Sequence, residues 1–191
     1  MALVPPPSRV PWLLRPALWA ARRITGKDPL PARLLAWSTK AALGAGVLEA
    51  TAAHGPVDLD TRLLAIARIV ASATAGCPFC LDMNAATHVR AGLTRAELEA
   101  LVSRDPARWS GLAPRERLAA EYAHRLSSTP VVLDDALRRE LTAAFTPREI
   151  VVLAGAIAQV NFWSRFNQGL DVPAAGFSDD GVCGVPYASG S

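Results

Sequence analysis

Charged residues and cysteine are scarce in this chain, and long apolar runs are absent. Each of these features excludes a class of protein. Charged residues make up 19% of the sequence and the net charge is only +3, so neither a nucleic-acid-binding surface nor a disordered chain is expected. No apolar run reaches the roughly 18 residues that a membrane span needs. The three cysteines fit a reducing, cytoplasmic setting better than a secreted fold held by disulfides.

Acidic residues are missing from the first 27 positions, which instead carry Arg9, Arg15, Arg22, Arg23 and Lys27. Pro5 to Pro7 precede any apolar stretch, so a secretory leader is not predicted. Residues 11–24 are typical of a short amphipathic helix with two tryptophans. It fits either a membrane-surface helix or an arm packed on its own domain or on a neighbouring subunit. The second interpretation is favoured because the helix is short and Pro16 interrupts it, so no membrane contact is expected.

The remaining pattern predicts an all-α helical bundle of about seven or eight helices, because no segment alternates as a strand does. We expect helices over residues 11–24, 31–53, 60–75, 78–91, 94–102, 114–127, 133–144 and 146–170. Residues 1–27 form a basic arm, 28–172 the helical domain and 173–191 an irregular tail. Gly44 and Gly46 weaken their helix, which predicts that another helix approaches it closely.

Helix starts are the best-defined local signals. Asp58 or Asp60 is a suitable cap for the third helix, and Thr94 with Glu97 forms a capping box. Thr146, Pro147 and Glu149 give a third strong start. Between Leu63 and Gly76 the only charge is Arg68, and a helix that is apolar on nearly all sides is a buried one.

The motif that carries chemistry is Gly76-Cys77-Pro78-Phe79-Cys80, at a predicted helix start. Unpaired N–H groups and the helix dipole favour a thiolate there, and a thiolate is the nucleophile toward peroxides and disulfides. Three other interpretations compete. A structural zinc site needs four ligands, and no second pair has ligand spacing. Two buried cysteines acting as small apolar residues remain an alternative, whereas a thioredoxin-like site requires strand–helix alternation that is absent.

The stretch LLAIARIVASATAGCPFCLDMNAATHVRAGLT (residues 63–94) resembles the core of the alkylhydroperoxidase D-like and carboxymuconolactone decarboxylase superfamily. Residues 161–172 (NFWSRFNQGLDV) are similar to the C-terminal helix of its peroxidase-related branch. The resemblance covers about residues 31–172 and implies an all-α fold that assembles into trimers or hexamers. It also implies that Cys80 attacks peroxide and that Cys77 resolves the product as a disulfide.

The chain departs from the redox-active members of that superfamily at three positions. They carry His four residues after the second cysteine, where this chain has Asn84, and Glu twelve residues before the first, where it has Ala65. The best-studied type also has His at the position of Phe79. The proton relay of that type is therefore absent, since an amide donates a hydrogen bond but does not shuttle a proton near pH 7.

Further residues are expected at the site. Asn84 is a hydrogen-bond donor to the thiolate, Asp82 is an acid–base candidate or a stabiliser of the turn, and His124 is a residue that reaches the site from another helix, with Glu121 to orient it. Substrate contacts are assigned to Arg68, Phe79 and His88. Arg68 is suited to lower the pKa of a thiol or to bind a carboxylate-bearing substrate, and it is equally suited to an ion pair with Glu49 or Glu121. His88 lies about 12 Å beyond Cys80 along a helix, so it fits a surface or interface position first.

The sequence thus predicts a thiol-dependent peroxidase or disulfide oxidoreductase that uses Cys77 and Cys80. Its partners would be a small peroxide or disulfide, an external thiol reductant and further copies of the chain, with no cofactor, metal or nucleic acid. Two alternatives stay open. One is a non-redox decarboxylase or lactone-type enzyme acting on a small carboxylate. The other is a non-catalytic oligomer that senses oxidation. Cys183, in the glycine-rich tail, is either a free thiol or a third redox partner.

Overall fold

The computed structural model describes residues 2–54 and 58–178, which contain nine α-helices, two 3-10 helices and no strand. Eight of the nine α-helices have eight residues or more, close to the seven or eight expected from the sequence. In chain order the elements are η1 (Trp12–Leu14), α1 (Arg15–Thr25), α2 (Leu30–Leu35), α3 (Thr39–Ala52), α4 (Thr61–Ala75), α5 (Pro78–Ala85), α6 (Arg95–Val102), η2 (Pro106–Gly111), α7 (Pro114–Ser127), α8 (Asp135–Ala144) and α9 (Pro147–Gly169).

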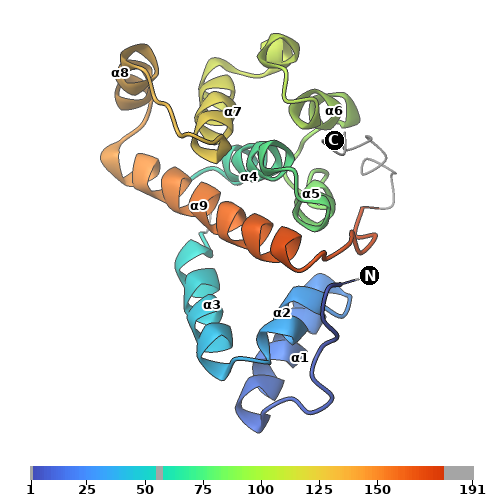
Figure 1. Cartoon of the computed structure of the whole chain (residues 1–191). Helices are drawn as coiled ribbons and strands as arrows, with labels where there is room; N and C mark the ends of the chain where they lie inside the picture. Colours follow the sequence, from blue (N-terminus) through green and yellow to red (C-terminus); the bar gives the residue numbers. More distant parts are fainter. Residues whose placement is uncertain (1, 55–57, 179–191) are drawn as a thin grey trace.

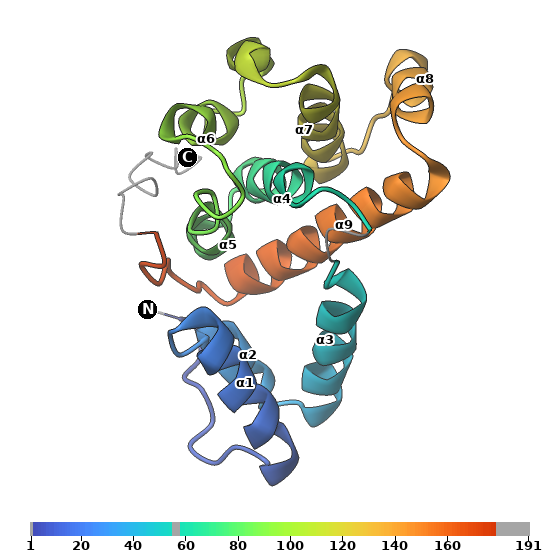
Figure 2. The same ribbon diagram turned by 180° about the vertical axis from the view of Figure 1, so that it is seen from behind.

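The longest helix, α9, divides the molecule into two parts (Figures 1 and 2). On one side α4 packs against α7 and α9, with α5, α6 and α8 around it. On the other side lie η1, α1, α2 and α3 (residues 12–52), which we call the arm from here on and which include part of the basic arm expected over residues 1–27. This arm contacts the rest of the molecule mainly between α3 and α9. Residues 170–178, which follow α9, lie beside α5 (Figures 1 and 2), and Ala2, Ala175 and Phe177 pack against the apolar cluster that contains Cys77 and Cys80.

Helix α4 is the centre of the main core, as its nearly uncharged sequence predicts. Asp60 caps it by accepting the backbone N–H groups of Arg62 and Leu63. Ile66, Ile69 and Val70 are completely buried, and burying each such side chain stabilises the fold by roughly 1.5–3 kcal/mol. Because α4 is enclosed on nearly all sides, its C-terminal end holds the cysteine motif on a rigid support.

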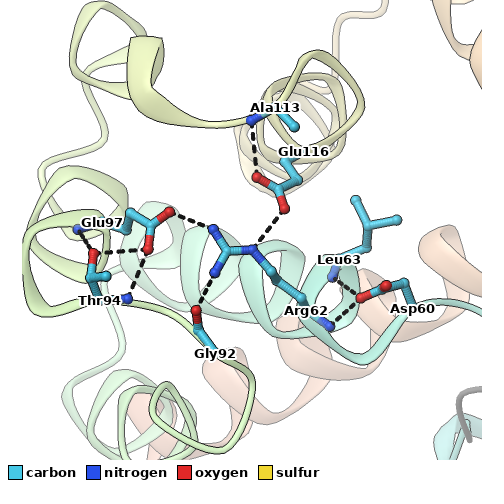
Figure 3. A network of polar contacts seen from close by, with 8 residues as sticks. All are labelled: Asp60, Arg62, Leu63, Gly92, Thr94, Glu97, Ala113 and Glu116. Atoms are coloured by element: carbon cyan, nitrogen blue, oxygen red, sulfur yellow. Dashed lines mark hydrogen bonds and ion pairs between the residues drawn. The ribbon is translucent and has the colours of Figure 1, made fainter.

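Arg62 ties the start of α4 to α6 and α7 (Figure 3). Its guanidinium donates to the carboxylates of Glu116 and Glu97 and to the carbonyl of Gly92. The hydrogen bonds from these carboxylates raise the pKa of Arg62. Glu97 also completes the capping box of α6 with Thr94, so one network fixes three helices.

The predicted helix over residues 31–53 is wrong in its continuity. The structure ends α2 at Leu35 and starts α3 at Thr39, with the Ser38 hydroxyl accepting the N–H of Ala41 as an N-cap. The close helix approach expected at Gly44 and Gly46 is also absent, because an added Cβ at either position meets nothing within 4 Å. The break at Ser38 has a local cause. Serine competes with the helix interior for backbone hydrogen bonds, and its hydroxyl caps α3 instead.

The arm exposes much of its apolar surface. Its exposed large side chains are Trp12, Leu13, Trp19, Ile24, Trp37, Leu43 and Val47. Pro16 lies in the first turn of α1 rather than interrupting the helix. Contiguous exposed apolar area of this kind usually marks a contact surface.

By length and hydropathy, no single helix in residues 2–54 and 58–178 is suited to span a membrane. Helices α8 and α9 meet the criterion only together, and they are bent by 118°.

Candidate active site

The cysteine motif begins at an abrupt junction between α4 and α5. Gly76 ends α4 in the left-handed conformation, with φ of 71°, which glycine adopts without strain. Cys77 is then the N-cap of α5, and Pro78 occupies the first turn where no N–H is needed. The junction therefore places Cys77 at the start of a new helix and Cys80 one turn further on.

The two sulfur atoms lie 2.6 Å apart, so the motif brings the thiols together as the sequence predicts. Both cysteines are free thiols and both are buried. They belong to a second apolar cluster, apart from the main core, with Leu34 of α2, Phe79 and Val172. The redox pair thus sits where the arm, α5 and the segment after α9 meet.

The pair shares one negative charge unequally. The hydrogen bond between the two sulfur atoms, together with that from the backbone N–H of Cys80, outweighs burial and lowers the pKa of Cys77 to about 7. The Cys80 N–H to Cys77 sulfur distance is 3.2 Å. The same interaction with Cys77, together with burial, raises the pKa of Cys80. These opposite shifts in pKa favour the negative charge on Cys77 and the proton on Cys80.

Two side chains of α9 face the sulfurs. The amide of Asn167 donates to the Cys80 sulfur at 3.4 Å, and both Asn167 and Ser164 are fully buried. The hydrogen bond from Asn167 acts against burial and tends to lower the pKa of both thiols. Neither Asn167 nor Ser164 was among the site residues expected from the sequence, because both lie far from the cysteines along the chain.

A cavity of about 230 Å³ gives access to Cys80. Its polar lining residues are Glu49, Arg68, Asn84, Gln159 and Trp163, and Cys77 does not line it. Glu49 and Ala53 at its edge are exposed, so the cavity reaches the surface between α3 and α9. Of the two cysteines, Cys80 is the one that meets a small molecule entering this space.

Arg68 and Glu49 place opposite charges on the cavity wall. Arg68 donates from Nη2 to the carbonyl of Ala52 at 2.8 Å, while its Nε is buried without a partner among the described residues. Burial lowers the pKa of Arg68, and the charge of Glu49 partly offsets this. The carboxylate of Glu49 is itself held by Gln159 and Trp163. Arg68 therefore lines the cavity, as expected of a substrate contact, without a direct ion pair to Glu49 or Glu121.

Asn84 lines the cavity but does not donate to a thiolate, contrary to expectation. Its amide donates to the Ser72 hydroxyl and to the Cys80 carbonyl, both at 2.9 Å. Ser72 in turn donates to the Arg68 carbonyl at 2.7 Å. Asn84 thus braces α5 against α4, and the thiolate contact expected of it is made by Asn167.

Asp82 is not an acid–base group for Cys80 in this arrangement. Its carboxylate, 1% exposed, accepts the backbone N–H groups of Ala175, Phe177 and Ser178 and the Ser178 hydroxyl at 2.8–3.0 Å. Burial raises the pKa of Asp82, but these hydrogen bonds outweigh it and hold the pKa below its ordinary value. Asp82 instead anchors residues 173–178, which we call the strap.

The strap also touches the N-terminal arm and the residue between the cysteines. Lys27 donates to the carbonyls of Ala175 and Gly176 and lies 5.4 Å from the ring centre of Phe177. Phe177 packs edge-on against Phe79, with ring centres 5.7 Å apart. Phe79 is therefore buried under the strap and does not line the cavity, so the expected substrate contact is not formed there.

Neither histidine expected at the site lies on the cavity wall. His88 is buried, and its Nδ1 is 2.8 Å from the Ala85 carbonyl. The Nδ1 of His124 lies 3.1 Å from the Thr74 hydroxyl near the end of α4. Glu121, expected to orient His124, pairs with Arg125 instead. Within the described ranges no three His, Cys, Asp or Glu side chains gather as metal ligands, and Cys183 lies outside those ranges.

Comparison with known proteins gives consistent similarities. Residues 41–125 match the model of the carboxymuconolactone decarboxylase family. The uncharacterized protein YnjA of Escherichia coli strain K12 is 33% identical over 191 residues, which cover 96% of this chain and 97% of that protein.

Solved structures share the fold. An uncharacterized peroxidase-related protein from Silicibacter sp. TM1040 has a TM-score of 0.78 at 18% identity, covering 92% of this chain and 93% of that one. The debrominase Bmp8 in complex with 2,3,4-tribromopyrrole has a TM-score of 0.74 at 22% identity, covering 88% of this chain and 89% of that one. At these identities the likeness concerns the fold alone.

Proposed function

Because this chain belongs to the carboxymuconolactone decarboxylase family and keeps a Cys-x-x-Cys pair in an alkylhydroperoxidase D-like fold, we propose that it is a thiol-dependent peroxidase or disulfide oxidoreductase. One observation carries the proposal. The sulfurs of Cys77 and Cys80 lie 2.6 Å apart at a helix start, and Cys80 lines a cavity that reaches the surface.

In the proposed cycle the proton first moves from Cys80 to Cys77. The Cys80 thiolate attacks the terminal oxygen of a hydroperoxide, so an S–O bond forms and the O–O bond breaks. The alcohol leaves with the proton from Cys77. The Cys77 thiolate then attacks the sulfenic acid on Cys80, which forms the disulfide and releases hydroxide. An external thiol supplies two electrons to reset the pair.

A proton shared between the two cysteines would take the place of the missing histidine–glutamate relay. The 2.6 Å separation of the sulfurs and the pKa of about 7 for Cys77 support a single proton shared by the pair near neutral pH. Asn167, which donates to the Cys80 sulfur, would stabilise the charge when it lies on Cys80. The pair would therefore act as its own general acid.

The wild-type protein tests the proposal directly. Addition of hydrogen peroxide or cumene hydroperoxide to the reduced protein should consume both thiols and form one disulfide per chain. Because the pKa of Cys77 is lowered to about 7, the rate should be low below that pH and rise to a plateau above it. Stopped-flow fluorescence and mass spectrometry measure the rate and the product.

The alternatives give different results in the same experiment. Thiols that titrate above about 8.5 and survive peroxide would contradict the proposal and favour a non-redox decarboxylase. Disulfide formation without repeated turnover in the presence of excess dithiothreitol would favour an oxidation-sensing protein. The complex of Bmp8 with 2,3,4-tribromopyrrole does not identify a substrate for this chain, because the likeness to Bmp8 concerns the fold alone.

We also propose that several copies of the chain assemble through the arm. Trp12 is 74% exposed, Trp19 69% and Ile24 82%, and such apolar area is costly to leave in water. Light scattering after size-exclusion chromatography should give a mass of at least two chains. The double variant Trp12→Glu and Trp19→Glu should lower that mass, whereas Val131→Glu, at a distant exposed position, should not. A wild-type monomer at micromolar concentration would contradict this assembly.

A further inference from the structure

Arg68 is a half-buried cation on the wall of the Cys80 cavity. Its Nη2 donates to the carbonyl of Ala52, and no acceptor among the described residues meets its Nε. Leaving a buried charged donor unsatisfied is costly. Glu49 and Glu121, the partners that the sequence allowed for this lone charge, bind Gln159 and Arg125 instead, so an anionic ligand in the cavity is a suitable acceptor for Arg68.

The dimensions of the cavity limit that ligand. A volume of about 230 Å³ is below the roughly 300–1,000 Å³ typical of pockets for drug-sized molecules. Cys80 and Arg68 both line this space. A ligand that reaches both is therefore short, with a thiol-reactive group at one end and an anionic acceptor at the other.

A carboxylate is the group that fits the arginine end. Guanidinium groups pair with carboxylates through charge-assisted N–H donors, and the Arg68 side chain lines the cavity together with Cys80. Glu49, the acidic residue on the cavity wall, is engaged at the edge by Gln159 and Trp163. It moderates the positive charge without occupying Arg68.

We propose that the cavity selects short peroxides that carry a carboxylate, with Arg68 binding the carboxylate while the peroxide group meets Cys80. This inference rests on the proposed peroxidase function and names the substrate class of that site. Arg68 is then a substrate-binding residue that sets specificity. Neutral alkyl hydroperoxides of similar length would react without the benefit of this contact.

Two peroxides of equal chain length test the preference. Monoperoxysuccinate carries a free carboxylate, and peroxybutanoic acid has a methyl group in its place. The ratio of their kcat/KM values for oxidation of the reduced pair should favour monoperoxysuccinate. Arg68→Met should lower that ratio about 10- to 100-fold, the effect expected for loss of a charged hydrogen bond. Arg68→Lys, which keeps the charge, should preserve most of it.

Glu49→Gln is the matched variant. Glutamine keeps an oxygen acceptor for Gln159 and Trp163 while removing the negative charge, so the ratio should rise by about threefold. Should Arg68→Met fail to fold, the rise in the ratio expected from Glu49→Gln still decides the matter. Equal slowing of both peroxides by Arg68→Met, or an unchanged ratio in Glu49→Gln, overturns the proposal.

A binding measurement separates this inference from the proposed function. Succinate, but not the neutral succinamide, should raise the melting temperature of the reduced wild-type protein, and Arg68→Met should abolish the shift. If neither peroxide oxidises the thiols while succinate still binds through Arg68, the peroxidase function fails and the carboxylate site stands. If the peroxides react but succinate neither binds nor competes, the carboxylate site fails alone.

Discussion

Replacement of Cys80 by serine is expected to lower the rate of peroxide consumption by about three orders of magnitude or more. A serine hydroxyl is a far weaker nucleophile than a thiolate, and Cys80 is the cysteine that lines the cavity. Cys77→Ser should behave differently. Cys80 would still be oxidised once, but its sulfenic acid would find no resolving thiol and would accumulate in a single stoichiometric step.

Mass spectrometry after trapping with dimedone distinguishes the two variants. Both belong in a Cys183→Ser background, which removes the third thiol and serves as the control with full activity. A trapped sulfenic acid in Cys80→Ser and none in Cys77→Ser would reverse the roles assigned to the two cysteines. Equal consumption of peroxide by both variants would contradict a division of roles altogether.

The second large effect concerns Asp82. Asp82→Ala should lower the free energy of unfolding by about 2–4 kcal/mol, because it leaves the N–H groups of Ala175, Phe177 and Ser178 without their acceptor. Urea denaturation measures the change. Glu99→Ala is a suitable control, since the Glu99 side chain is 52% exposed, and its loss should matter by less than about 0.5 kcal/mol.

The contribution of Asp82 should also depend on pH with a defined sign. Burial raises its pKa, but the hydrogen bonds from the strap hold the folded value below the ordinary 3.8. The stabilisation is therefore complete above about pH 4 and is lost as the pH falls through the folded pKa. The difference in stability between the wild type and Asp82→Asn should shrink in that acidic range. A difference that grows on acidification would contradict the role given to Asp82.

Local signals in the sequence were sufficient to place most helices. The capping boxes at Thr94–Glu97 and Thr146–Glu149 are confirmed, because both partners of each hydrogen bond lie within four residues. The cysteine motif at a helix start is confirmed for the same reason. The break at Ser38 was missed because apolar periodicity continues across it, and a single N-cap residue is a weak competing signal.

The surroundings of the thiols depended on distant contacts that no local pattern encodes. Asp82 is bound by residues more than ninety positions later in the chain, in a segment with neither helical nor strand periodicity. Asn167 reaches Cys80 across 87 positions. The charge on Arg68 drew attention to it, but only the packing of α3 and α9 beside α4 creates a cavity at that residue.

The hydrogen bonds from Lys27 to the strap have a consequence for shortened forms of the protein. Lys27 ends the basic segment at the start of the chain, yet it binds the carbonyls of Ala175 and Gly176, which Asp82 holds next to the reactive helix. Removal of residues 1–27, by truncation or by proteolysis, would therefore also loosen the strap that packs on Phe79. Shortened chains that begin after residue 27 would lack these contacts to the strap, even though every residue of the thiol centre is still present.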